Sequence, residues 1–259
     1  MSRADRIAIL LSLIAVVAAY FIAERIFEQI PHLEDEMAYV WQSKAFARGQ
    51  LTVPTPPEPK SFLVPFVVDY EGRRFGKYPP GWPALLAIGE LVGLRGWINP
   101  LLSGLGIWLT YRIGKKILGE TVGLLAAGLT ITSPLFLMNS GMLLSHPLGL
   151  VLTAGFCLSW LNAFWKPDHP RPWISTLIGA VCLGWLAVTR PWTAVAVALP
   201  FAAHGLYLLI YSKWSTRRRL IAFILVTLAI SALVPVWQKA VTGDFTLNPY
   251  TLWWEYDKV

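Results

Sequence analysis

The sequence predicts an all-α integral membrane protein with about seven transmembrane helices, and three observations support this prediction. Of the 259 residues, 55% are hydrophobic and only 14% are charged, whereas about a quarter of a soluble domain is charged. The apolar residues come in long blocks, and a helix needs ~20 of them to cross the hydrocarbon. The chain has thirteen tryptophans, a residue type that gathers at membrane interfaces.

The apolar blocks define the predicted spans. The block 7–27 is longer than the ~7–15 apolar residues of a signal peptide, and no small-residue cleavage site follows it. We therefore expect an uncleaved first transmembrane helix. Six further helices are predicted within 97–237, at 97–116, 121–139, 146–165, 173–189, 192–211 and 219–237.

The block 81–94 is the one that we do not expect to span. It contains Glu90 and about fourteen residues, and stretches of ~10–14 are more often interfacial. If it stays at the outer surface, the N-terminus is cytoplasmic and most basic residues lie inside. The inner basic residues are then Arg3, Arg6, Arg112, Lys115, Lys116, Lys166, Arg171, Lys213, Arg217, Arg218 and Arg219, against Arg190, Lys239 and Lys258 outside the long first loop.

A second topology stays open. In a flipped model with eight spans, residues 24–80 lie in the cytosol, but this model needs the short block to span and exports Arg3 and Arg6. We favour seven helices in the inner or plasma membrane, with the first loop outside. The net charge of +7 sits in short clusters between apolar blocks, so we expect no nucleic-acid partner.

The first loop, 28–95, is the predicted catalytic element, and 238–259 forms a further outer segment. Loops beyond ~12–15 residues are uncommon unless they are functional or disordered, and apolar residues run through this one. Helical spacing predicts an amphipathic helix on the membrane that ends near Gly49. Its apolar face holds Leu33, Met37, Val40 and Trp41, together with Lys44, whose ammonium can reach water while its methylene chain lies on the membrane. The proline-rich segment 53–59 is expected to be extended, and 62–70 to contain a short strand.

An acidic trio, Glu34-Asp35-Glu36, lies at the start of this predicted helix. Carboxylates in a first turn stabilise the positive end of the helix dipole, so solvated caps are one interpretation. The other interpretation is a catalytic site, and it depends on a resemblance.

Asp35, Glu36 and Tyr39 resemble the first-loop signature of GT-C fold membrane glycosyltransferases, an Asp-Glu pair followed three residues later by Tyr. The similar enzymes are protein O-mannosyltransferases, the lipid A aminoarabinose transferase and bacterial family 39 or Rgt-like transferases. Lys77-Tyr78-Pro79-Pro80 is similar to their Lys-Pro-Pro element with one residue inserted. Further similar features follow in order at Gly49 to Pro54, Gly114 to Gly119, Thr132 to Pro134, Ser145 to Pro147 and Thr189 to Pro191.

The chain departs from this family pattern in two ways. His146 stands where many members have a carboxylate. Members also continue beyond seven helices, so we expect this chain to correspond to their N-terminal portion.

The resemblance implies transfer of a monosaccharide from a polyprenyl-phosphate donor, with inversion, to a lipid, polysaccharide or protein acceptor. Asp35 is then the expected base, with Glu36 assisting. The leaving phosphate gathers negative charge, and cations would stabilise it. The candidate cations are Lys77, Arg190, Arg73 and Arg74.

Two alternatives stay open. Asp35, Glu36 and His146 could together bind a divalent metal, because carboxylates and imidazole suit Zn or Mn. The chain could also be a polyprenyl-lipid transporter or a non-catalytic scaffold. A transporter usually carries ionisable residues within its spans, and these spans hold almost none.

Overall fold

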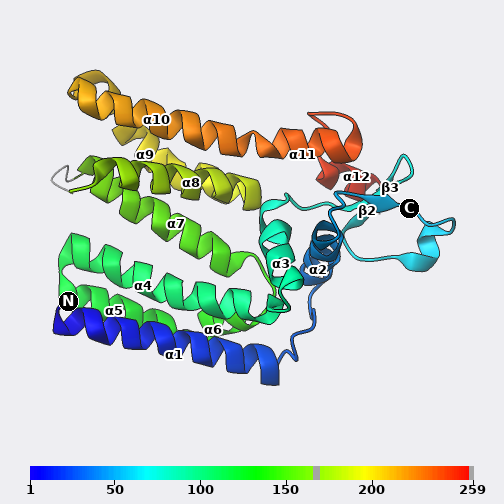
Figure 1. Cartoon of the computed structure of the whole chain (residues 1–259), viewed down its shortest axis with the longest axis horizontal. Coiled ribbons are helices and arrows are strands. Elements are labelled where there is room, and N and C mark those ends of the chain that lie inside the picture. Colours follow the sequence, from blue (N-terminus) through cyan, green and yellow to red (C-terminus); the bar gives the residue numbers. More distant parts are fainter. Residues whose placement is uncertain (166–169, 257–259) are drawn as a thin grey trace. The chain divides into compact units, whose positions relative to one another are not determined.

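The computed structural model describes residues 1–165 and 170–256, which form a mostly helical chain with one small sheet (Figure 1). Lys166 and Lys258, which entered the charge count, lie outside the described residues. The helices are α1 (Arg3–Arg25), α2 (Glu34–Ala47), α3 (Gly81–Leu91), α4 (Ile98–Leu118), α5 (Glu120–Ile131), α6 (Pro134–Gly141), α7 (His146–Trp160), α8 (Pro172–Thr189), α9 (Pro191–Tyr211), α10 (Trp214–Ser231), α11 (Leu233–Thr242) and α12 (Pro249–Tyr256). The strands are β1 (Val53–Pro54), β2 (Val67–Tyr70) and β3 (Arg73–Gly76), and a π-helical turn at Leu161–Trp165 continues α7.

Five helical stretches in the described part of the chain are long and apolar enough to cross a membrane. They are α1, α7 with its π-helical turn, α8, α9, and α10 with α11. The number is six if α5 and α6 form one span, bent by 63°. Ser133 lies at this bend in an extended conformation, as expected for a residue before proline. The helix α4 covers the predicted span 97–116 without being one of these, so seven spans stay a prediction.

The helix α3 has only 11 residues, too few for the ~20 that a span needs. That 81–94 stays at the outer surface remains a prediction. Glu90, near the end of α3, forms an ion pair of 2.7 Å with Arg95.

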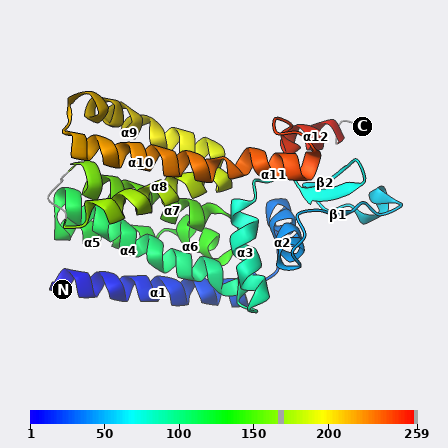
Figure 2. The ribbon, with the colours of Figure 1, turned by 45° about the horizontal axis from the view of Figure 1, so that its top comes forward.

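The chain divides into two compact units, each built from distant segments. The first comprises Met1–Ile14, Gly104–Thr132 and Leu148–Ala232. Within it α8, α9 and α10 pack side by side (Figure 2). The helices α4 and α5 approach closely at Gly114, where an added Cβ would lie 2.7 Å from the Cα of Gly123. Small residues allow this kind of contact between membrane helices.

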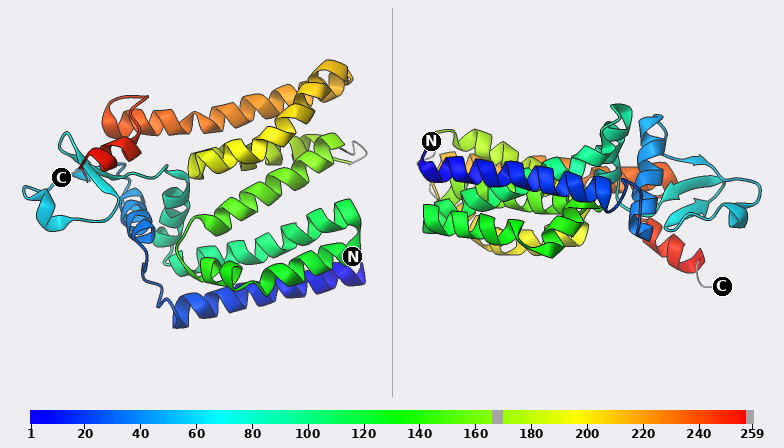
Figure 3. Two further views of the ribbon diagram at one scale, coloured as in Figure 1. Left: turned by 180° about the vertical axis from the view of Figure 1, so that it is seen from behind. Right: turned by 90° about the horizontal axis from the view of Figure 1, so that it is seen from below.

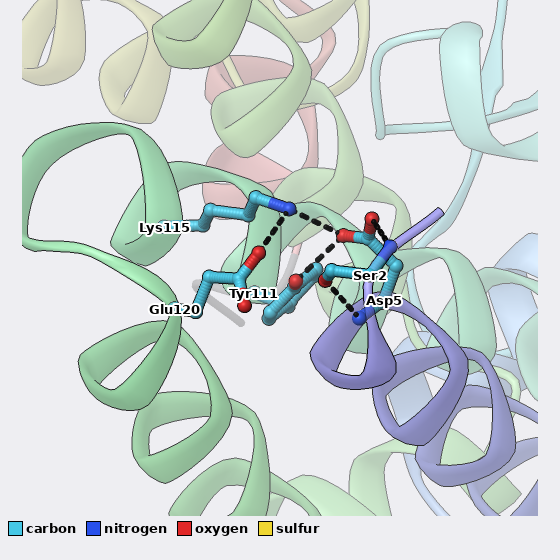
Figure 4. Close-up of polar contacts among 5 residues, drawn as sticks. All are labelled: Ser2, Asp5, Tyr111, Lys115 and Glu120. Carbon is cyan, nitrogen blue, oxygen red and sulfur yellow. Dashed lines mark hydrogen bonds and ion pairs between the residues drawn. The ribbon is translucent and has the colours of Figure 1, made fainter.

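A polar network joins three helix ends of the first unit (Figure 4). One carboxylate oxygen of Asp5 accepts hydrogen bonds of 2.6 Å from both Tyr111 and Lys115. Lys115 also pairs with Glu120 at 2.8 Å. Since these residues come from α1, α4 and α5, the network fixes the start of α1 against the α4–α5 turn.

The second unit comprises Ala15–Ser103, Ser133–Pro147 and Leu233–Val259, and it contains the sheet. The strand order is β1-β3-β2, and all pairs are antiparallel. Glu71 and Gly72 connect β2 to β3 with φ of 47° and 74°. Positive φ at both central residues is the type I′ hairpin geometry, which favours glycine. The prediction of an all-α chain is therefore corrected: β-branched residues and this turn make 67–76 a hairpin.

The sheet packs on α11 through a small apolar core. Val68 and Phe75 of the hairpin lie buried with Trp237 and Val241 of α11. The helix α12 contacts β2, and α2 packs along α3 (Figure 3). These contacts position the loop residues that the sequence singled out.

Candidate active site

Asp35 and Tyr78 form the central polar pair of the second unit. Asp35 is a partly buried residue in the first turn of α2, and its Oδ1 accepts a short hydrogen bond from the Tyr78 hydroxyl. Burial raises the pKa of Tyr78 above its ordinary value, and the bond to Asp35 raises it further. Tyr78 is therefore a proton donor that holds one oxygen of the carboxylate in place.

Gln42 fixes the distance between α2 and the segment that carries Tyr78. Its side-chain oxygen accepts a hydrogen bond of 2.5 Å from the backbone N–H of Gly76, and its amide donates to Leu51 at 3.0 Å. Gln42 is fully buried. The Tyr39 ring, one turn before it, lies 4.7 Å from the Tyr78 ring. One helix face therefore aligns Asp35, Tyr39 and Gln42 along the strand end.

Lys77 lies beside this pair within three aromatic rings. Its ammonium is 3.4 Å from the centroid of Phe66, 5.1 Å from Tyr78 and 5.0 Å from Tyr250. Phe66 has a φ of 59°, which is unusual for a bulky residue, and its carbonyl accepts the backbone N–H of Lys77. The site thus combines a carboxylate, a phenol and a buried cation.

Glu36 has a different environment from Asp35, although the two residues are adjacent. Its carboxylate is 1% exposed. One oxygen accepts the backbone N–H groups of His32 and Leu33 at 2.8 and 3.0 Å, and the other accepts the N–H of Leu143 at 2.5 Å. These three bonds fix the Glu36 carboxylate against the backbone of residues 32, 33 and 143, and its predicted assistance to Asp35 stays a prediction.

The segment Met142–Leu144, which Glu36 binds, is also held from two other helices. Trp82 of α3 donates to the Leu143 carbonyl at 2.9 Å. The Asn99 amide of α4 donates to Met142 and Leu144 at 2.5 and 2.9 Å. His146 begins α7 two residues after this segment, and its side chain is exposed.

No metal centre forms among the residues that the structure describes. It contains no group of three or more His, Cys, Asp and Glu side chains that could hold an ion. Asp35, Glu36 and His146, the predicted ligand set, are therefore not brought together. The physical reason lies in Glu36, whose oxygens already accept backbone N–H groups.

The two adjacent arginines of β3 also differ from each other in burial and in hydrogen-bond partners. Arg74 is buried, forms a bidentate pair with Asp69 at 2.6 and 2.8 Å, and donates to the Phe62 and Pro59 carbonyls. These bonds fix the Arg74 guanidinium within the second unit, and its predicted phosphate contact stays a prediction. Arg73 is exposed and donates to the Ala240 carbonyl at 3.4 Å.

Arg190 belongs to the first unit. It occupies the junction between α8 and α9, where its Nε lies 3.5 Å from the Thr193 hydroxyl. Its side chain packs on Gly149 of α7, since an added Cβ there would lie 3.1 Å from Arg190 Cδ. Arg190 is partly buried, as expected for a side chain held by two helices.

Sequence reasoning missed three members of the site: Tyr78, Phe66 and Tyr250. The sequence motif contained Tyr78, as the residue inserted before Pro79-Pro80, but did not assign it a role. Its position next to Lys77 was the available signal that it belongs to the site. Phe66 and Tyr250 gave no local signal, because they meet Lys77 only through the folded hairpin and α12.

The comparisons with known proteins concern most of the chain. Residues 80–238 match the family of dolichyl-phosphate-mannose-protein mannosyltransferases. The match begins after Tyr78, so it covers His146 and Arg190 but not Asp35. No curated protein sequence matches the chain.

The fold also resembles a solved structure, the archaeal oligosaccharyltransferase AglB from Archaeoglobus fulgidus in complex with an inhibitory peptide and a dolichol-phosphate. The TM-score is 0.54 at 15% sequence identity, over 87% of this chain and 29% of that one. The chain thus spans less than a third of that enzyme, and the similarity concerns the GT-C fold. Because the family match covers more than half of its residues, the chain belongs to the dolichyl-phosphate-mannose-protein mannosyltransferase family of multi-pass membrane glycosyltransferases.

Proposed function

We propose that the chain moves a monosaccharide from a polyprenyl-phosphate donor to an acceptor hydroxyl at the outer face of the membrane. The observation that carries this proposal is the Asp35–Tyr78 hydrogen bond beside the Lys77 ammonium. Family membership supports the reaction class. The dolichol-phosphate and the peptide bound to the archaeal oligosaccharyltransferase support a lipid-linked donor and leave a protein, lipid or polysaccharide acceptor open.

Asp35 is the proposed base. Tyr78 occupies Oδ1, and Oδ2 has no hydrogen-bond partner among the described residues. That oxygen would take the proton of the acceptor hydroxyl while the acceptor oxygen bonds to the anomeric carbon. The bond from this carbon to the phosphate oxygen breaks on the opposite side, so the configuration inverts and the lipid phosphate leaves.

The leaving phosphate needs positive charge in a preorganised position. Lys77 is our first candidate, because three aromatic rings hold its ammonium near the Asp35–Tyr78 pair. Arg190 and Arg73 are further candidates. Arg190 precedes α9 directly, and Arg73 is exposed on β3.

The test is Asp35→Asn in the full chain, reconstituted in liposomes and assayed with labelled polyprenyl-phosphate mannose. Loss of a general base typically costs ~10²–10⁴-fold, so we expect transfer to fall by that factor while donor binding stays. Glu34→Gln is the matched control, since Glu34 is exposed in the same turn. Undiminished transfer by Asp35→Asn would show that the base assignment is wrong.

The proposed orientation has its own test. Gln50 is exposed after α2, so a Gln50→Cys variant in intact cells should react with a membrane-impermeant thiol reagent. Protection of that cysteine would place the first loop in the cytosol and contradict the outer-face site.

A further inference from the structure

A cavity of about 350 Å³ lies within the first unit, and its lining includes no residue of the candidate active site. Its walls come from the end of α4, the end of α7 and the middle of α9. Most of the lining is apolar, and its two ionisable residues are Lys116 and His204. A large apolar wall with few polar groups is typical of ligand sites.

A hydrogen bond fixes the proton of His204. The Trp160 indole N–H donates to Nδ1 of His204 at 3.1 Å. Because an indole nitrogen only donates, Nδ1 accepts and the ring carries its proton at Nε2. The neutral ring therefore keeps Nε2–H as a donor, and His204 lines the cavity together with Lys116.

A second cavity of about 300 Å³ adjoins the first, because Trp160 and Phe201 line both. Its described lining is entirely apolar and comes from α7, α8, α9 and α10. The two adjoining cavities thus combine an apolar lining with the polar side chains Lys116 and His204. This combination suits an amphiphile with an anionic head.

The position of the site within the first unit favours the same ligand. Figure 1 shows α4 ending and α10 beginning at one end of this unit. Lys115 and Lys116 lie in the last turn of α4, and Lys213 precedes α10. Basic pockets between membrane helices are known to bind anionic lipid headgroups.

Buried Arg219 holds the π-helical turn that lines part of the cavity. It donates to the Ala163 carbonyl at 2.9 Å, within the π-helical turn that carries Trp165. Its guanidinium lies 5.9 Å from the Phe164 ring. This contact stabilises the turn, and the turn supplies one side of the cavity.

We propose that these cavities bind one anionic phospholipid, with its phosphate at Lys116 and the Nε2–H of His204 and an acyl chain between Trp160 and Phe201. The occupant is a lipid of the surrounding bilayer, distinct from the sugar donor. The site is therefore independent of the proposed transfer reaction.

Native mass spectrometry of the purified full chain can test this proposal. The chain is titrated with phosphatidylglycerol or with phosphatidylcholine of the same acyl chains. We expect wild type to retain phosphatidylglycerol preferentially. One lysine near an anionic headgroup contributes ~1 kcal/mol, so Lys116→Gln should weaken its binding about fivefold. His204→Phe keeps an aromatic ring but lacks the donor, and it should weaken binding about tenfold, as expected for a hydrogen bond to a charged group.

Two controls separate a specific site from general attraction. Lys116→Arg keeps the charge and should bind like wild type. Lys213→Gln removes an exposed lysine that does not line the cavity, and it should change affinity less than about twofold if the site is specific. Equal weakening by Lys116→Gln and Lys213→Gln, or equal binding of the two lipids by wild type, would overturn the proposal.

Discussion

The Tyr78 hydroxyl donates its hydrogen to Asp35, and this bond joins residues that lie 43 positions apart in the chain. It connects the start of α2 to the residue that follows β3 and Lys77. The bond therefore forms only when the hairpin is folded and docked on α2. The position of Asp35, the proposed base, therefore depends on the fold of the whole loop.

Tyr78→Phe should lower transfer by ~10–100-fold, because a hydrogen bond to a charged group contributes ~1.5–3 kcal/mol. The phenylalanine keeps the ring contacts with Tyr39 and Tyr250, so the fold should persist. Initial rates of transfer check this prediction, with thermal unfolding as the control for folding. Tyr207→Phe, a change of an exposed tyrosine in α9, is the matched control and should leave the rate unaltered.

The raised pKa of Tyr78 predicts an alkaline loss of stability. The folded state binds the phenol proton more tightly than the unfolded state, in which the pKa is about 10. The contribution is fully present below that value and falls as the pH rises above it, because the unfolded state then releases the proton first. Thermal unfolding at pH 8 and pH 10.5 should show a larger loss for wild type than for Tyr78→Phe. An equal loss in both proteins would contradict the burial of this phenol.

Glu36 and Glu34 provide a matched pair for stability. Glu36→Gln replaces one accepting oxygen with an amide that faces a backbone N–H, and an unsatisfied buried donor costs ~1–3 kcal/mol. Glu34 is the exposed first residue of α2, so Glu34→Gln should change the free energy of unfolding by less than ~0.5 kcal/mol. Denaturant or thermal unfolding of both variants measures the difference. Similar values for the two would show that Glu36 does not hold the Leu143 segment.

The sequence could predict the helical blocks, the short segment α3 and the position of Asp35 at the start of a helix, because each depends on local composition or motif. It could not separate Asp35 from Glu36. That distinction comes from Leu143, which lies 107 positions from Glu36. The same holds for Arg73 and Arg74, which alternate across β3 so that only Arg74 meets Asp69.

Tyr78 is the opposite case, a residue to which the sequence assigned no role and which the fold places in the candidate site. Compared with the family pattern, Tyr78 is a residue inserted between Lys77 and Pro79, and an insertion alone does not indicate a function. The fold places its hydroxyl on Asp35, because the strand before it ends at Gly76, where Gln42 fixes the register against α2. The surrounding rings of Phe66 and Tyr250 come from the residue before β2 and from α12, which are far apart in the chain.

Lys77 offers the sharpest test of the proposed phosphate contact. Lys77→Met keeps an unbranched side chain among the three rings and removes the charge, so the fold should tolerate it. If the ammonium contacts the leaving phosphate, donor binding should weaken and transfer should fall, because the developing negative charge loses its partner. Lys77→Arg should restore little, since a guanidinium is too broad for an enclosure in which the ammonium lies 3.4 Å from the Phe66 centroid. Equilibrium binding of a polyprenyl-phosphate and the rate of mannose transfer are measured for both variants, with thermal unfolding as the control for folding. A Lys77→Met protein with wild-type donor affinity and rate would make Lys77 a purely structural cation and leave Arg190 and Arg73 as the candidates for the phosphate.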